Sequence, residues 1–201
     1  MGNINKGIIR QAFIIGIISF VVAILMSQVS GVVVNDFHNL VLALVLLVLI
    51  IIIGIIFDII GVATTVAESH PFHAKASKKV KGSRQANILI SKADKVASLC
   101  NDVVGDICGT VSGSLGAAII FMIYAGRADT EQTLGATLMT GIIAALTVGG
   151  KAAGKKIALE QSEQVVFRVA QVIAWAEDFL GFTILKPKRT RRNREKVPKH
   201  D

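Results

Sequence analysis

The sequence predicts an all-α membrane protein that crosses the bilayer several times. Of its 201 residues, 52% are hydrophobic and only 18% are charged, and the mean hydropathy is +0.61. The apolar residues are gathered into long uncharged runs, which a soluble domain of this length could not bury in one core. Four such runs, separated by short polar segments, predict a polytopic protein with four transmembrane helices.

The first two expected spans differ in how clearly the sequence marks them. Residues 8–29 form an extra N-terminal span whose strictly uncharged part, 12–26, is short for a bilayer. Because small residues follow at 27–31, a cleaved signal peptide is the alternative interpretation. Residues 30–39 are expected to be a loop. The second span covers 40–57 without a charge, and its helical pattern continues to about Ala67.

A juxtamembrane helical hairpin is predicted over residues 71–95. Ser69 followed by Pro71 is typical of a helix start. In both halves apolar side chains occupy one face and lysines or arginines the other, and Lys81-Gly82-Ser83 is expected to form the turn between them. We therefore expect this segment to lie against the membrane surface.

The rest of the chain supplies two more spans and an amphipathic helix. The third span is predicted over 96–125, where Gly105, Gly109 and Gly113 recur every four residues, a spacing that allows close helix packing in the bundle or across a homodimer interface. The fourth span covers 133–150. Residues 160–180 follow the helical period with one apolar face and are expected to form an interfacial helix. Residues 183–201 are expected to be a disordered basic tail that contacts anionic lipid.

The positive charges predict the orientation. The formal net charge of +8 comes mainly from the hairpin and the tail, whereas the expected loops at 30–39 and 126–132 hold a single arginine. By the positive-inside rule, a multi-pass protein of the cell membrane with both termini in the cytoplasm is expected. Basic residues are not interleaved with aromatic ones, so nucleic acid is not an expected partner. Cys100 and Cys108 are roughly 12 Å apart along one helix, and we expect reduced, packed thiols.

The most informative polar feature is a pair of carboxylates at the start of the third span. Asp102 and Asp106 are four residues apart, which places them on one face of an α-helix. An ionisable group at membrane depth is costly unless it is paired, hydrated or bound to a cation. The alternative interpretation is that Lys151 or Lys155 neutralises these aspartates, or that water hydrates them at the interface.

Several segments together resemble a known transporter domain. Four short stretches correspond to motifs of that family: 58–65 at the end of the second span, 81–83 in the hairpin, 101–106 at the start of the third span, and 149–151. On these residues, positions 40–182 resemble the transmembrane domain of the CorB/CorC and cyclin-M (CNNM) magnesium transporters. The chain is accordingly divided into an N-terminal span and loop (1–39), a CorC-like transmembrane domain (40–182) and the tail (183–201).

The resemblance implies a partly dehydrated Mg²⁺ bound between the spans. Asp102 and Asp106 take the positions of two asparagines of the family, and Asp58, Thr64 and Thr65 stand in its small polar stretch. Oxygen ligands of this kind suit Mg²⁺, a hard cation. The sequence departs from the family at its glutamate, which is replaced by Gly150 or Lys151, and it lacks the proline and the regulatory CBS modules. A separate regulatory subunit is therefore an expected partner.

These observations give two main hypotheses. The first is a homodimeric membrane protein that binds and transports divalent cations, with Mg²⁺ as the expected ion and Asp102, Asp106, Asp58, Thr64 and Thr65 as metal site. The second is a non-transporting scaffold or partner subunit that retains the same bundle. A third idea, a sensor of anionic lipid surfaces, rests on the amphipathic segments and the tail. An enzyme is not expected, because the sequence contains no nucleophilic triad, glycine-rich phosphate loop or zinc-ligand spacing.

Overall fold

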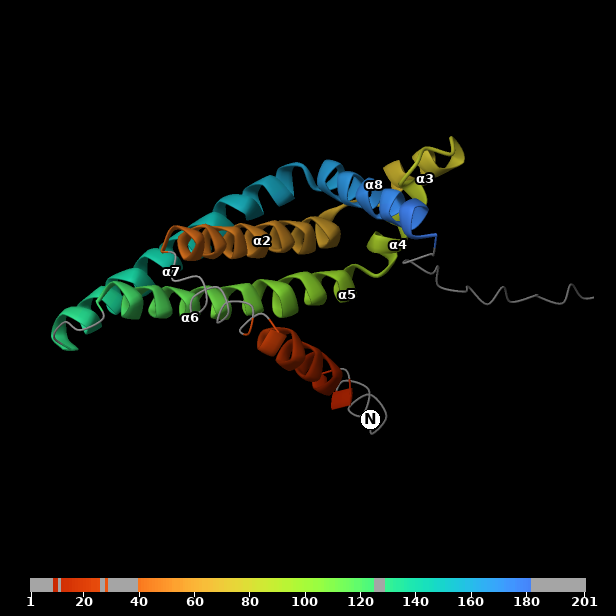
Figure 1. The fold of residues 1–201 in the computed structure, drawn as a ribbon. Helices are drawn as coiled ribbons and strands as arrows, with labels where there is room; N and C mark the ends of the chain where they lie inside the picture. Colours follow the sequence, from red (N-terminus) through yellow and green to blue (C-terminus); the bar gives the residue numbers. More distant parts are fainter. Residues whose placement is uncertain (1–8, 11, 26–27, 29–39, 125–128, 182–201) are drawn as a thin grey trace, which may run out of the picture.

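A computed structural model describes residues 9–10, 12–25, 28, 40–124 and 129–181. Within these ranges every regular element is a helix, which confirms the all-α prediction. The expected basic tail and the loop at 30–39 lie outside the described residues (Figure 1).

Three helices in the described part are long and apolar enough to cross a membrane. They are α2 (Leu40–Val66), the continuous helix Ala93–Ile123, and α7 (Asp129–Glu160). This agrees with the expectation of a polytopic membrane protein. The expected first span is described only in part, as the shorter apolar helix Ala12–Leu25, so the number of four spans is not confirmed.

The middle span is not a uniform α-helix. It begins as α5 (Ala93–Ala97), widens into the π-helical segment η1 (Ser98–Gly105) and continues as α6 (Asp106–Ile123). A π-helical turn is bonded i to i+5, and such segments are frequently found at functional sites. No local pattern in the sequence predicts this widening.

The helix α2 contacts the two other spans through one stripe of buried residues. The stripe recurs every three or four positions and contains Ala43, Leu47, Ile50, Gly54, Asp58, Gly61 and Thr64. Gly54 faces Cys108 and Gly61 faces Asn101, so α2 and the middle span are antiparallel neighbours. Gly150 and Gly154 of α7 face Ile55 and Ile59, so α2 and α7 run parallel (Figure 1).

The other faces of the spans are apolar and exposed. On α2 they carry side chains such as Val45, Leu49 and Ile52, and on α7 Leu138 and Leu146. Exposed aliphatic surface of this extent is typical of helices that are surrounded by lipid tails.

Three shorter helices pack together at one end of the bundle (Figure 1). They are α3 (His70–Ser77), α4 (Ser83–Ser91) and α8 (Ser162–Leu180). Their shared apolar cluster includes Phe72, Leu89, Val166 and Ala170, and it extends to Ala63 of α2. The helix expected at 160–180 is therefore present, with one side buried against this cluster.

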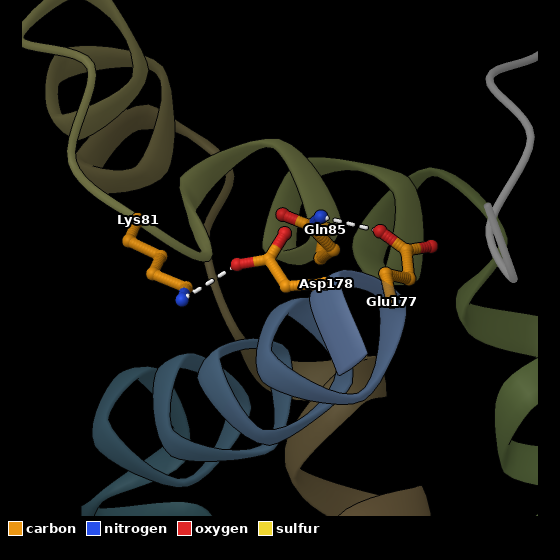
Figure 2. A network of polar contacts seen from close by, with 4 residues as sticks. All are labelled: Lys81, Gln85, Glu177 and Asp178. Carbon is orange, nitrogen blue, oxygen red and sulfur yellow. Dashed lines mark hydrogen bonds and ion pairs between the residues drawn. The ribbon is translucent and has the colours of Figure 1, made fainter. Parts of the chain in front are cut away.

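Polar contacts join α8 to the connection before α4 and to α4 itself (Figure 2). The Lys81 ammonium lies 2.7 Å from an Asp178 carboxylate oxygen, and the Gln85 amide donates to Glu177 at 2.7 Å. Gly82 has φ +89°, and a Cβ at this position would collide with Gln171 of α8. Glycine is required there for both the left-handed turn and the close approach.

Two details differ from the sequence-based description. The fourth span was expected to end at Gly150, and its helix continues to Glu160, with Gly150 and Gly154 packed against Ile55 and Ile59 of α2. Of the three glycines at four-residue spacing, Gly105 lies near Lys151, whereas a Cβ on Gly109 or Gly113 would meet no atom within 4 Å among the described residues.

Candidate polar site between the spans

Asp58 places a carboxylate inside the bundle. Its side chain is only 8% exposed, and its Oδ1 lies 3.9 Å from Nζ of Lys151 on α7, whose side chain is 22% exposed. This separation is longer than a charge-assisted hydrogen bond, so the two groups attract each other without direct contact. The second carboxylate oxygen, Oδ2, is buried and has no hydrogen-bond partner among the described residues.

Asn101 brings a second unpartnered oxygen to the same side of α2. Its Oδ1 lies directly against Gly61, where any Cβ would overlap it. Asp58 and Gly61 are three residues apart on α2, so the Asn101 amide and the Asp58 carboxylate lie on one helical face, about one turn apart. In the described part of the chain, Asn101 Oδ1 is buried and accepts no hydrogen bond.

Lys151 completes the junction of the three spans. A Cβ on Gly105 would lie 3.4 Å from the Lys151 ammonium, so the lysine reaches from α7 to both α2 and η1. Thr147, one turn earlier on α7, also has a buried hydroxyl without a partner among the described residues. Three of the four such atoms in those residues, on Asp58, Asn101 and Thr147, therefore belong to the helices that form this junction.

The junction lies toward one end of α2. Asp58 lies about 27 Å along the helix from Leu40, close to the typical hydrocarbon thickness of about 30 Å. The short helices α3, α4 and α8 lie at this same end.

Buried oxygens without hydrogen-bond partners cost free energy, and this cost makes a cation a favourable partner for the junction. A buried acceptor without a donor loses about 1–3 kcal/mol relative to one that is satisfied. Here a carboxylate oxygen and an amide oxygen are both in this state, while the nearest cation, Lys151, remains beyond hydrogen-bond distance of Asp58. Carboxylate and amide oxygens are ligands that hard cations accept.

The structure separates the residues that the sequence grouped into a metal site. Asp58 is buried, but the side chains of Asp102 and Asp106 are exposed. Thr64 is buried and donates its hydroxyl to the carbonyl of Ile60, whereas Thr65 is exposed and donates to Val62. Among the described residues, no group of three or more histidines, cysteines, aspartates or glutamates is arranged to hold a metal ion.

The sequence-based argument did not include Asn101 or Thr147. Its alternative interpretation placed Lys151 or Lys155 beside Asp102 and Asp106, whereas in the structure Lys151 lies beside Asp58. Asn101 shares a helical face with Gly105 and Cys108, at intervals of four and three, and small residues mark the face that packs against a neighbour. That pattern would have predicted that Asn101, rather than Asp102, faces the neighbouring helix. Cys100 and Cys108 are buried free thiols, as expected.

Comparison of the chain with models of known protein families, with curated proteins and with solved structures finds no match. The resemblance to the magnesium transporter domain therefore stays a prediction that rests on the four short stretches of sequence described above.

Proposed function

We propose that this chain is a membrane protein that binds a cation at Asp58 and carries it across the bilayer. The observation that supports the proposal is the junction of α2, η1 and α7, where Asp58 Oδ2 and Asn101 Oδ1 are buried without donors among the described residues. Ionisable groups inside membrane bundles commonly mark ion pathways. A cation bound to these two oxygens would remove the cost of leaving them unsatisfied.

In this proposal Lys151 is the counter-ion of the empty site. Its ammonium keeps Asp58 electrically balanced from 3.9 Å, and its side chain is partly exposed on a flexible stem. When a cation binds, the lysine retracts toward water, and when the cation leaves, the lysine returns. The lysine therefore supplies the positive charge beside Asp58 when the cation is absent, and the cation supplies it when bound.

Mg²⁺ is the cation that we propose first. It prefers oxygen ligands and gives up water reluctantly, so a site with few protein oxygens and room for water suits it. The resemblance of residues 40–182 to magnesium transporters supports the same ion. Asp58 and Asn101 are the proposed ligands, and Thr147 is a further candidate.

A homodimer remains part of the proposal and gives Asp102 and Asp106 a place in it. Both carboxylates are exposed on a helix that is apolar enough to span the membrane, and Gly109 and Gly113 on that helix have no described residue packed against them. Lipid tails are a poor environment for carboxylates, and open glycines allow a second helix to approach closely.

The experiment that tests the function is Mg²⁺ flux into liposomes that contain the purified chain and a Mg²⁺-sensitive dye. We expect Asp58→Asn to lower the flux by about tenfold or more, as the loss of a ligand or its immediate support does at metal sites. Asp102→Asn with Asp106→Asn is a matched arm, because it makes the same chemical change at exposed positions of the sequence-based site. Asp178→Asn, outside the spans, is the control.

The results separate three interpretations. Flux that depends on Asp58 alone supports the site described here, whereas flux that depends on Asp102 and Asp106 would return the site to the sequence-based set. A wild-type protein with no flux would contradict transport.

The second candidate function is a non-transporting scaffold or partner subunit. The specific observation in its favour is that Lys151 already supplies the positive charge that Asp58 requires. In that case the ion pair only holds the three spans together, and neither Mg²⁺ nor any other divalent cation changes the thermal stability of the protein.

A further inference from the structure

A pocket of about 390 Å³ lies between the N-terminal helix and the beginning of the middle span. The described residues that line it are Arg10, Ile14, Ile15, Ile18, Lys95, Ser98, Leu99 and Val103. Its volume falls in the range of sites that hold small organic molecules. None of these residues belongs to the junction at Asp58.

The lining has two parts of opposite character. The polar part consists of the Arg10 and Lys95 side chains together with Ser98, and the remaining five residues are aliphatic. Of the described residues that line the pocket, none is acidic. A ligand that fills it must therefore combine negative charge with apolar surface.

The charged and apolar parts are ordered along both helices in the same way. On the N-terminal side Arg10, Ile14 and Ile18 follow one another at intervals of four residues. On the other side Lys95, Leu99 and Val103 do the same. Both series begin with a cation and continue with aliphatic residues for about 12 Å. The pocket is therefore an apolar slot with the two cations at one end.

The cationic end lies at the end of the bundle where α3, α4 and α8 pack together. Lys95 lies in α5, shortly after α4, and α4 packs with α3 and α8 at that end. The aliphatic residues of the slot lie further along a helix that is apolar enough to span a membrane. Ile14, Ile18 and Leu99 are exposed, so the slot is open to the surroundings of the bundle.

From this arrangement we infer that the pocket binds one anionic phospholipid of the surrounding bilayer. The headgroup phosphate lies between Arg10 and Lys95, with Ser98 as a hydroxyl donor, and one acyl chain follows Ile14, Ile18, Leu99 and Val103 into the membrane. Basic pockets between transmembrane helices suit anionic headgroups, and a zwitterionic lipid gains less from two cations. The lipid also joins the N-terminal helix to the bundle.

The test is native mass spectrometry of the full chain in detergent with equal amounts of phosphatidylglycerol and phosphatidylcholine. We expect one tightly retained phosphatidylglycerol, and Arg10→Gln with Lys95→Gln should weaken its binding on the order of tenfold, because each surface cation contributes to the attraction. Lys78→Gln with Arg84→Gln removes the same charge from exposed positions elsewhere and should retain the lipid. Leu99→Phe, which fills the apolar part, should weaken both lipids.

Each other outcome would overturn the inference. Equal retention of the two lipids would mean that the pocket recognises only an acyl chain. Glycerol phosphate that competes fully with phosphatidylglycerol would mean a site for a free phosphate. Equal losses in the two double variants would mean a general attraction to anionic lipid without a defined site. Retention of the lipid in the Arg10 and Lys95 variant, with normal thermal stability, would place the lipid elsewhere.

Discussion

Lys81 and Asp178 meet at 2.7 Å with more than half of each side chain exposed, whereas Lys151 and Asp58 stand 3.9 Å apart and are largely buried. The first pair belongs to the end of the molecule where α3, α4 and α8 pack together, and the second to the junction of the spans. Good geometry at the surface contributes little to stability, because water already satisfies both groups. Poor geometry in the interior leaves groups for which another partner would be favourable.

The apolar contacts also differ between the end of the bundle and the junction of the spans. At the end of the bundle, Phe72 is fully buried, its ring lies 6.3 Å from that of Phe167, and the Lys75 ammonium lies 4.2 Å from the Phe167 centroid. Packing, an aromatic pair and a cation–π contact therefore act together there. At the junction, small residues such as Gly54, Gly61 and Gly105 bring backbones close, while oxygens of Asp58 and Asn101 have no hydrogen-bond partner among the described residues. The contrast teaches that well-packed contacts hold the short helices at the end of the bundle, whereas the junction contains buried oxygens without hydrogen-bond partners among the described residues.

The largest loss in the free energy of unfolding is expected for a substitution of Lys151, and a small loss there would contradict the contrast between the two regions. Lys151→Met leaves the Asp58 carboxylate buried without a counter-ion, and we expect a loss of about 3 kcal/mol in the free energy of unfolding. Asp58→Asn should cost less, because the partly exposed lysine can turn to water. The measurement is unfolding in mixed micelles followed by helical circular dichroism.

Two controls sharpen that prediction. The double variant Asp58→Asn with Lys151→Met should be more stable than Lys151→Met alone, since it removes the uncompensated charge. Millimolar Mg²⁺ should stabilise Lys151→Met more than the wild type, because the cation no longer competes with the ammonium. A single variant as stable as the double would show that the pair has no electrostatic role.

An intermediate effect is expected at the glycines. A Cβ on Gly54 would lie 2.9 Å from the Cβ of Cys108, an atom that cannot move without its backbone. Gly54→Ala should therefore push α2 away from α6 and cost about 1–3 kcal/mol. Gly109→Ala is the matched control, because it has open space among the described residues and removes a glycine from a helix, which favours folding by up to about 1 kcal/mol.

Thermal unfolding of both alanine variants measures this difference. If Gly109→Ala is as destabilising as Gly54→Ala, the Gly109 face is occupied by another helix, and the homodimer proposal gains support at the expense of the packing argument.

The smallest effect is expected at the surface pair. Lys81→Gln removes an ion pair whose side chains are 59% and 68% exposed, and the cost should be below about 1 kcal/mol. The same unfolding assay at low and high salt checks this, because salt screens exposed pairs strongly and buried pairs weakly. A loss as large as that of Lys151→Met would contradict the contrast between the two regions.

Much of the fold could be predicted from the sequence, because the bilayer imposes a simple pattern. The long apolar segments at 40–57, 96–125 and 133–150 all correspond to helices long enough to span a membrane, although the second of them contains Asp102 and Asp106. The amphipathic period at 160–180 predicted α8 for a similar reason, since one of its faces must be buried. The glycine in Lys81-Gly82-Ser83 marked a turn that requires a positive φ.

The candidate site could be predicted only in part. Asp58 was selected because it stands in the stretch, 58–65, that resembles the small polar motif of the transporter family. The choice between Asn101 and Asp102 depends on which side of the middle span faces α2, and the π-helical segment η1 alters that rotation without leaving a trace in composition or spacing. Lys151 was expected outside the membrane because the fourth span was expected to end at Gly150. In the structure α7 continues to Glu160, and Gly150 packs on Ile55 of α2, which brings Lys151 next to the other spans.

Only Gln161 stands between α7 and α8. Ala158, in the last turns of α7, belongs to the apolar cluster in which α8 packs against α4. This contact and the short connection leave α7 and α8 little freedom to move independently. A tilt of α7, which carries Lys151, would therefore move α8 as well. Trp175, the single tryptophan of the chain, lies on α8 and stacks against Phe179, so its fluorescence would report a movement of α8.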